Sequence, residues 1–256
     1  MDIRMIVMDL DRTLLSSDKE VSARNLAAIE ACRGRGIVIG VATARSLCQS
    51  RRILDVVRPD VFISSGGAVA TYRGKVIYEA LLSAEVTNAL VARFVQAEGV
   101  GQITINTVEG FFVSDEAVLD RWSRDFCHAQ YVDFAVKQHP AAEKIVPQIS
   151  LDVAAAIVAE FPGVGFIPYS GENWVTFACK GATKFQGVAA AAAHLGIDIA
   201  HVAAFGDDHN DVEMLERCGV GVAMANGISS THEAADFVTL SNDEDGVAVW
   251  IEENIL

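Results

Sequence analysis

The sequence MIVMDLDRT at residues 5–13 is the strongest indication of how this chain folds. Its first four residues are apolar and predict a buried strand, and two carboxylates follow at Asp9 and Asp11. Because strand residues of the same parity share a face, these two side chains are expected to leave the strand end as a close pair. Two carboxylates at the end of a buried strand are costly unless a cation or a reaction needs them.

A second acidic cluster follows a later apolar run. HVAAF at residues 201–205 predicts another buried strand, and GDDHND follows at 206–211. The carboxyl ends of parallel strands meet at one edge of a sheet, where ligands bind in open α/β folds. The two acidic endings therefore predict one shared metal site.

Predicted strands and helices alternate at both ends of the chain. Apolar strands are expected at 4–8, 37–42 and 61–64, with helices at 22–32 and 45–57, the first capped by Ser22. After Lys184 the alternation returns, with helices at 184–195, 211–216 and 229–235 and strands at 201–205, 220–223 and 237–239. Strands that are apolar throughout indicate a parallel sheet covered on both faces. We predict an α/β fold with a Rossmann-like, doubly wound parallel sheet.

The middle of the chain has a different pattern. Hairpins are expected at 101–114 and 163–179, a strand at 144–150, and helices at 82–98, 117–127 and 153–161. Such a mixture is typical of an α+β domain rather than of more doubly wound sheet. We therefore predict a core formed by residues 1–81 and 184–256, with an inserted α+β cap domain at 82–183.

Charge and cysteine content narrow the partners and the compartment. With 34 acidic and 20 basic residues the net charge is −14, which disfavours nucleic acid and anionic membranes as partners. The chain enters a strand at once, which predicts no signal peptide, and no apolar run is long enough for a membrane span. Five scattered cysteines without a C-x-x-C pair argue against a disulfide framework and favour a reducing cytoplasm, with each thiol as a small core residue.

Four ordered motifs together resemble the haloacid dehalogenase (HAD) superfamily. They are D-x-D-x-T at residues 9–13, Thr43 after the second strand, Lys184 at the start of a late helix, and G-D-D-x-N-D at 206–211. Their spacing and the long insert resemble the Cof-type phosphatases, which carry a large α/β cap between the second and third motifs. The resemblance covers the whole chain. It departs at Arg12, where the pattern usually has glycine, and at Ser65, where Cof-type proteins often have asparagine.

The resemblance and the chemistry of phosphoryl transfer imply roles for the motif residues. Asp9 is the expected nucleophile, which forms an aspartyl-phosphate, and Asp11 is the expected general acid and base. Lys184 would offset the charge of the nucleophile, and Thr43 would bind the phosphate through its hydroxyl and nearby N–H groups. Arg45 is expected either to reach the substrate phosphate or to lie solvated on its helix.

The remaining site residues concern the metal and the ligand. An oxygen-only set formed by Asp9, the Asp11 carbonyl group and Asp207 suits Mg²⁺, with Asp211 as a support or a ligand through water. Asn210 would orient phosphate or a ligand carboxylate, as the resemblance implies. Asp208 is expected to be a helix N-cap.

We therefore expect a cytoplasmic, Mg²⁺-dependent phosphomonoester hydrolase, a HAD-type phosphatase. Its partner would be a small phosphorylated metabolite such as a sugar phosphate. A phosphomutase on the same core and a nonenzymatic sugar-phosphate sensor are the alternatives. A phospho-receiver module is disfavoured by its shorter length, and a dehalogenase by the presence of Asp11, which that chemistry does not need. The sequence leaves open the physiological substrate, the oligomeric state and the effect of Arg12.

Overall fold

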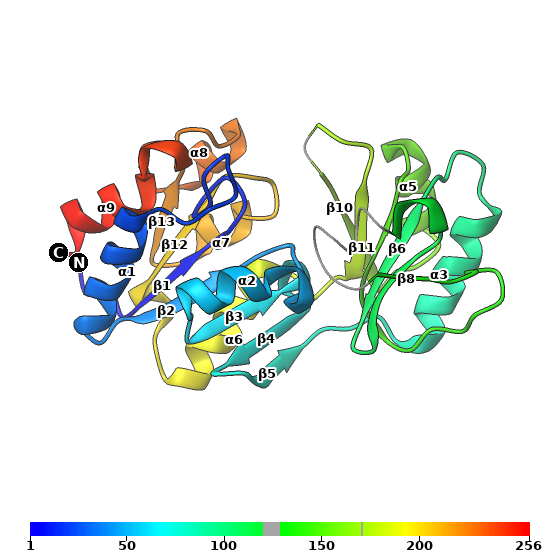
Figure 1. Cartoon of the computed structure of the whole chain (residues 1–256), viewed down its shortest axis with the longest axis horizontal. Helices are drawn as coiled ribbons and strands as arrows, with labels where there is room; N and C mark the ends of the chain where they lie inside the picture. The colour runs from blue at the N-terminus through cyan, green and yellow to red at the C-terminus, as the bar shows by residue number, and fades with distance from the viewer. Residues whose placement is uncertain (120–128, 170) are drawn as a thin grey trace. The chain divides into compact units, whose positions relative to one another are not determined.

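The computed structural model describes residues 1–119, 129–169 and 171–256. These residues form two compact units, which are described separately below (Figure 1). The first unit comprises Met1–Arg45, Ser50–Glu79 and Thr183–Leu256, and the second comprises Ser46–Gln49 and Ala80–Ala182. Both ends of the chain therefore belong to the first unit.

An eight-stranded sheet forms the centre of the first unit, with strand order β14-β13-β12-β1-β2-β3-β4-β5. All neighbours from β14 to β3 pair in parallel, whereas β3–β4 and β4–β5 are antiparallel. The predicted doubly wound α/β fold is confirmed, and β4 and β5 extend it by a hairpin. The strands are β1 (Met5–Met8), β2 (Val38–Ala42), β3 (Val61–Ser64), β4 (Val69–Tyr72), β5 (Lys75–Glu79), β12 (Val202–Gly206), β13 (Val220–Ala223) and β14 (Phe237–Val238).

Helices cover both faces of this sheet, as the apolar strands predict (Figure 1). Alternate residues of β1 belong to different hydrophobic clusters: Ile6 and Met8 pack with residues of α1 and α9, and Met5 and Val7 pack with residues of α6. The central strand is therefore buried on both sides. The helices are α1 (Ala23–Gly34), α2 (Leu47–Val57), α6 (Lys184–Leu195), α7 (Val212–Arg217), α8 (Ser229–Ala234) and α9 (Gly246–Asn254).

Side-chain caps set the starts of two of these helices. The hydroxyl of Ser22 accepts a hydrogen bond from the Asn25 N–H at 3.0 Å, which confirms the predicted N-cap of α1. Thr183 caps α6 by accepting from the Gln186 N–H at 3.2 Å. Each cap satisfies an N–H group that the first helical turn leaves without a backbone partner.

The second unit contains a six-stranded sheet in the order β10-β11-β9-β6-β7-β8, in which β7 and β8 pair in parallel and the other neighbouring strands pair antiparallel. Helices α3 (Ala84–Gln96) and α5 (Leu151–Val158) contribute to one apolar cluster with this sheet. The α+β insert and its two hairpins are confirmed. The predicted helix at 117–127 lies mostly outside the described residues, which contain a short 3₁₀ turn at Glu116–Val118. The strands are β6 (Ile103–Thr107), β7 (Gly110–Val113), β8 (Ala129–Tyr131), β9 (Ala142–Pro147), β10 (Val164–Pro168) and β11 (Val175–Cys179).

The cysteines follow the sequence expectation in part. Cys32 and Cys218 are free and buried, and burial raises the pKa of the two thiols to about 11 and about 12. Cys179 is also free. Cys48 differs, because it is disulfide-bonded and not a free core thiol as expected. Among the described residues, no helix has the length and apolar character that crossing a membrane requires.

Candidate active site

Asp9 follows β1 at the carboxyl edge of the parallel sheet. Its N–H donates to the Phe205 carbonyl at 3.0 Å, which extends the pairing of β1 with β12. Its side chain is 7% exposed, and Lys184 donates to its Oδ1 at 2.7 Å. Burial raises the pKa of Asp9, and the Lys184 ammonium opposes this shift while Asp211, Asp207 and Asp11 add to it. The carboxylate therefore depends on cations for its charged form.

Lys184 is the first residue of α6 and is almost completely buried, at 1% exposure. Its ammonium group lies between two carboxylates, 2.7 Å from Asp9 Oδ1 and 2.5 Å from Asp211 Oδ1. Burial lowers the pKa of Lys184, but these two carboxylates outweigh that effect and raise it above its usual range. The nearby Lys180 is exposed, as predicted. A lysine at a helix N-terminus is unfavourable with the helix dipole, and the carboxylates of Asp9 and Asp211 compensate for this.

Asp211 is fully buried and uses both oxygens within this unit. Oδ1 accepts from Lys184, and Oδ2 accepts from the N–H groups of Asp207 at 3.0 Å and Asp208 at 3.1 Å. Gly206 makes this possible, because a Cβ there would lie 2.4 Å from Asp211 Cβ. The glycine at the end of β12 therefore lets Asp211 fold back over the strand end.

Asp208 is not the N-cap that the sequence predicted. Helix α7 begins at Val212, and Asp211 occupies the N-cap position. The Asp208 carboxylate instead accepts from the N–H of His209 at 2.8 Å. The Asp211 N–H donates to the Asp208 carbonyl at 2.9 Å and so closes a turn at 208–211. The N-cap therefore lies at Asp211, three residues after the predicted position.

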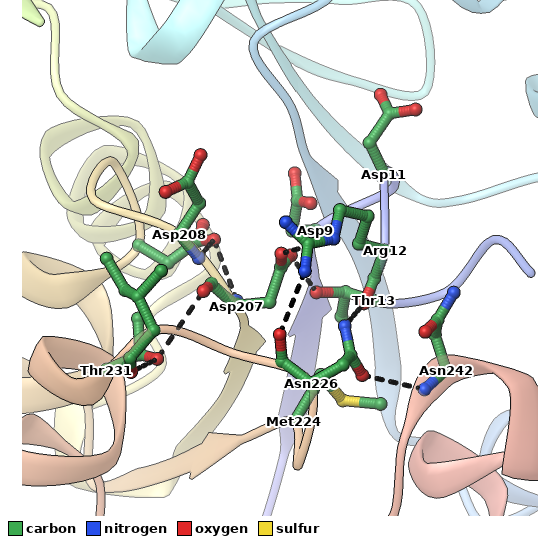
Figure 2. A network of polar contacts seen from close by, with 12 residues as sticks. Asp9, Asp11, Arg12, Thr13, Asp207, Asp208, Met224, Asn226, Thr231 and Asn242 are labelled. Carbon is green, nitrogen blue, oxygen red and sulfur yellow. Dashed lines mark hydrogen bonds and ion pairs between the residues drawn. The ribbon is translucent and has the colours of Figure 1, made fainter. Parts of the chain in front are cut away.

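Asp207 lies beside Asp9 and Asp211 in a buried acidic group. One carboxylate oxygen from each of the three lies within 4.8 Å of the others. Thr13 donates its hydroxyl to Asp207 Oδ1 at 2.8 Å, and Arg12 Nε lies 3.8 Å from Oδ2 (Figure 2). Burial and the neighbouring Asp211 raise the pKa of Asp207 to about 6. The oxygen donors and their mutual repulsion fit a bound divalent cation.

Asp11 and Asp9, the two carboxylates that follow the first strand, are held by different cations. Arg45 donates to Asp11 Oδ2 from Nε at 2.7 Å and to Oδ1 from Nη2 at 2.6 Å, and Lys19 donates to Oδ1 at 3.0 Å. Figure 2 shows the Asp11 side chain directed away from Asp207. Burial raises the pKa of Asp11, but Arg45 and Lys19 outweigh it and lower the pKa overall.

Arg45 is therefore not solvated on its helix, which was the second of its two predicted places. It precedes α2 instead of lying on it, and its side chain is only 16% exposed and bound to Asp11. The Asp11 carboxylate raises the pKa of Arg45 against the opposing effect of burial. The backbone N–H of Arg45 donates to the hydroxyl of Thr43 at 3.1 Å.

Thr43 and Asn210 lie at the ends of two parallel strands. Thr43 follows β2 and is 1% exposed. Its carbonyl accepts from the Gly66 N–H at 3.0 Å, which ties it to the turn after β3. Asn210 lies half-buried in the turn between β12 and α7, next to the exposed His209. Both predicted ligand residues thus follow strands of the same parallel sheet, β2 and β12.

A family model described as haloacid dehalogenase-like hydrolase matches residues 6–251. The chain belongs to this family. The match includes every site residue described above, from Asp9 to Asp211. The resemblance inferred from the four motifs is confirmed.

Relatives that are named as phosphatases align over nearly the whole chain. "Putative phosphatase YxeH" of Bacillus subtilis (strain 168) is 27% identical over 274 residues, which cover 99% of this chain and 98% of the relative. The 5-amino-6-(5-phospho-D-ribitylamino)uracil phosphatase YitU of the same organism is 25% identical over 265 residues, with 97% and 96% covered. The solved structure of the HAD subclass IIB sugar phosphatase BT4131 matches with a TM-score of 0.86 at 25% identity and 98% coverage of each chain. The predicted enzyme class, a HAD-type phosphatase, is confirmed.

The two departures from the HAD pattern share one backbone property. Arg12 has φ 62° and Ser65 has φ 52°, so both lie in the left-handed region. Glycine and asparagine, the residues of the pattern, are those that adopt this region most readily. Arg12 and Ser65 therefore adopt a backbone conformation that suits the usual residues of the pattern better.

Arg12 was expected only as a departure from the HAD pattern, and Lys19 and Asn226 were not predicted as site residues. Asn226 donates to the Arg12 carbonyl at 2.8 Å, and Arg12 donates to the Asn226 carbonyl at 3.0 Å (Figure 2). A signal for Asn226 was present, because it is a polar residue just beyond the carboxyl end of β13. Nothing in the sequence pairs Lys19 with Asp11.

Proposed function

We propose that this HAD-like hydrolase cleaves small phosphomonoesters, such as sugar phosphates, in a Mg²⁺-dependent reaction that passes through an aspartyl-phosphate on Asp9. The observation that carries the proposal is the buried Asp9 carboxylate, held by Lys184 at 2.7 Å beside Asp207. A carboxylate is a weak nucleophile in water, and a fixed position with its hydration removed makes it effective.

The reaction would proceed in two displacements. In the first, an Asp9 oxygen forms a bond to phosphorus while the bond from phosphorus to the leaving oxygen breaks, and Asp11 gives that oxygen a proton. In the second, water attacks phosphorus and passes a proton to Asp11. The bond between phosphorus and Asp9 then breaks and inorganic phosphate leaves. Asp9 and Asp11 thus return to their starting states.

We assign Thr43 to binding of the substrate phosphate and Lys184 to neutralisation of negative charge. The buried Thr43 hydroxyl would donate to a phosphoryl oxygen, with N–H groups of the strand-to-helix turn beside it. Lys184 would neutralise the nucleophile and the transferring group at the same time, because its ammonium already contacts Asp9. Asn210 is assigned to substrate orientation.

The donor set fits magnesium. We assign Asp9, Asp207 and the Asp11 carbonyl group as its ligands, since hard cations prefer oxygen. Asp211 is given a supporting role, because Lys184 and two backbone N–H groups already occupy its oxygens. When bound, the ion would supply positive charge to the phosphoryl oxygens.

Asp11 would have to leave its ion pairs before it could act as an acid. Arg45 and Lys19 favour its ionised form, whereas protonation of a leaving group requires the neutral acid. A dianionic phosphate is a strong competitor for a guanidinium group. We therefore assign Arg45 to the substrate phosphate during turnover, which would release Asp11.

Residues 1–81 and 184–256 would be the catalytic core, and residues 82–183 the cap that selects the leaving group. We place the enzyme in the cytoplasm, supported by the free thiols Cys32, Cys179 and Cys218. The disulfide at Cys48 weighs against this placement. Alkylation of the thiols at the moment of cell lysis would show whether Cys48 is reduced, as the cytoplasm requires.

A panel of phosphomonoesters tests the proposed function. Purified protein is assayed for release of inorganic phosphate with Mg²⁺ and with excess chelator. We expect turnover of small phosphorylated metabolites that stops in the chelator and returns when Mg²⁺ is restored. Undiminished turnover in chelator would refute the metal assignment. Transfer of the phosphoryl group to a second position of a sugar phosphate, without release, would identify a phosphomutase instead.

A further inference from the structure

Arg12 places a fixed positive charge next to the acidic group of the site. Its Nε lies 3.8 Å from Asp207 Oδ2. The Arg12 side chain is 53% exposed, whereas that of Asp207 is 2% exposed. The guanidinium group therefore lies on the solvent side of a buried carboxylate.

The two oxygens of Asp207 have different surroundings. Oδ1 accepts the Thr13 hydroxyl at 2.8 Å, so this oxygen is already engaged. Oδ2 is the oxygen that faces Arg12. A cation that uses the Asp207 carboxylate would thus approach the oxygen that the guanidinium group already faces (Figure 2).

Several bonds hold Arg12 in this place. Arg12 and Asn226 exchange two hydrogen bonds, from Nη2 of Arg12 to the Asn226 carbonyl at 3.0 Å and from Nδ2 of Asn226 to the Arg12 carbonyl at 2.8 Å. Asn226 Oδ1 in turn accepts from the Asn242 N–H at 2.9 Å, and Asn242 Nδ2 donates to the Leu15 carbonyl at 2.9 Å. The bond from Nη2 holds the guanidinium group, and the bond to the Arg12 carbonyl supports the left-handed backbone of this residue.

We propose that Arg12 is a positioning residue that weakens the binding of divalent cations at this site, because its guanidinium group shares the Asp207 carboxylate and repels the incoming ion. The proposal rests on the metal dependence proposed above. Without the ion, the guanidinium group offsets part of the Asp207 charge. With the ion, two positive charges lie on one carboxylate, and their repulsion opposes binding.

Titration calorimetry of the metal-free protein with MgCl₂, without substrate, tests this inference. Arg12→Asn removes the charge but keeps a residue that tolerates the left-handed backbone. Arg12→Lys keeps the positive charge but lacks the guanidinium group that donates to the Asn226 carbonyl. Arg24→Asn is the matched control, because it removes an arginine of similar exposure that is paired with Glu252 on the surface.

We expect the Kd for Mg²⁺ to fall about tenfold in Arg12→Asn at low ionic strength, and less at high salt, because charge repulsion is screened there. Arg12→Lys and Arg24→Asn should remain within about twofold of the wild-type Kd. Arg12→Gly removes the charge and also relieves the strain of the left-handed backbone at this position. Its Kd for Mg²⁺ should match that of Arg12→Asn, which would show that the effect in Arg12→Asn does not come from a folding defect.

Equal Kd values in the wild type and Arg12→Asn would overturn the inference while leaving the proposed function intact. Equal changes in Arg12→Lys and Arg12→Asn would also overturn it, since the effect would then come from the lost bonds to Asn226 and not from charge. Absence of Mg²⁺ binding in every variant would overturn both the inference and the proposed metal dependence.

Discussion

The ammonium group of Lys184 lies 2.7 Å from Oδ1 of Asp9, although 175 residues separate the two in the sequence. Asp9 follows the first strand of the core, and Lys184 opens the helix that returns the chain to the core after the insert. Formation of this pair therefore requires the two parts of the core, before and after the insert, to fold together.

The first prediction separates Lys184 from Lys180. Lys184→Ala should lower kcat at least ~100-fold, because it removes the cation beside the nucleophile. Lys180→Ala should leave kcat near the wild-type value, since that side chain is exposed. Steady-state kinetics of both variants, with circular dichroism as a check of folding, provide the measurement. The reverse order of effects would show that the wrong lysine has been assigned.

The second prediction concerns Asp11. Asp11→Asn should slow the hydrolysis of alkyl phosphates much more than that of nitrophenyl phosphate, because an alkoxide needs a proton to leave and a nitrophenolate hardly does. Comparison of kcat/KM for the two classes in wild type and variant is the measurement. An equal loss on both classes would exclude Asp11 as the general acid.

The third prediction uses the raised pKa of Asp207. Its pKa is about 6 in the folded protein and ordinarily 3.8, so the folded state holds the proton more tightly between these values. The free energy of unfolding should therefore fall as the pH rises from about 4 to about 6, and the loss is complete above that.

Asp207→Asn removes this ionisation. In chelator near pH 7, the variant should be more stable than the wild type by on the order of 2–3 kcal/mol, and the two should converge near pH 4. Urea unfolding at both pH values measures the difference. A variant no more stable than the wild type at neutral pH would contradict the assigned pKa shift.

The fourth prediction concerns Gly206. A Cβ at this position would lie 2.4 Å from Asp211 Cβ, so Gly206→Ala must displace Asp211 and with it the bonds to Lys184 and to the Asp207 N–H. We expect a loss of about 1–3 kcal/mol in stability together with a large loss of activity.

Gly34→Ala is the control, because a Cβ there meets no atom within 4 Å. Thermal unfolding and phosphate release should be close to wild type in this variant. If Gly206→Ala behaved in the same way, the close approach of Asp211 to the strand end would not be needed for the site.

The core sheet was predictable because its strands are buried on both faces and therefore apolar throughout. The edge hairpin was missed, since β4 and β5 are partly exposed and lack that pattern. The turn of this hairpin consists of Arg73 and Gly74, which both have positive φ angles of 47° and 77°. An Asn-Gly pair is the usual sequence signal for such a hairpin turn, and arginine at the first position hides it. Helix α9 was missed as well. Its valine, tryptophan and isoleucine residues favour strands as much as helices.

The site was predictable where residues follow strand ends. Asp9, Thr43 and Asp207 could be placed because parallel strands end at one edge. The partners of the charged groups could not be predicted, because pairs such as Asp11 with Arg45 depend on the paths of loops and not on any periodicity. Asp208 was assigned wrongly as a cap for a similar reason, since the turn at 208–211 makes Asp211 the N-cap residue.

The central claim is that Asp9 becomes phosphorylated during turnover. Rapid acid quench of the wild-type enzyme with a good substrate and Mg²⁺, followed by peptide mass spectrometry, tests it directly. We predict one phosphoryl group on the peptide that contains Asp9, lost on mild alkaline treatment as an acyl phosphate should be, and absent from Asp9→Asn. A phosphoryl group on another residue, or full turnover by Asp9→Asn, would contradict the claim.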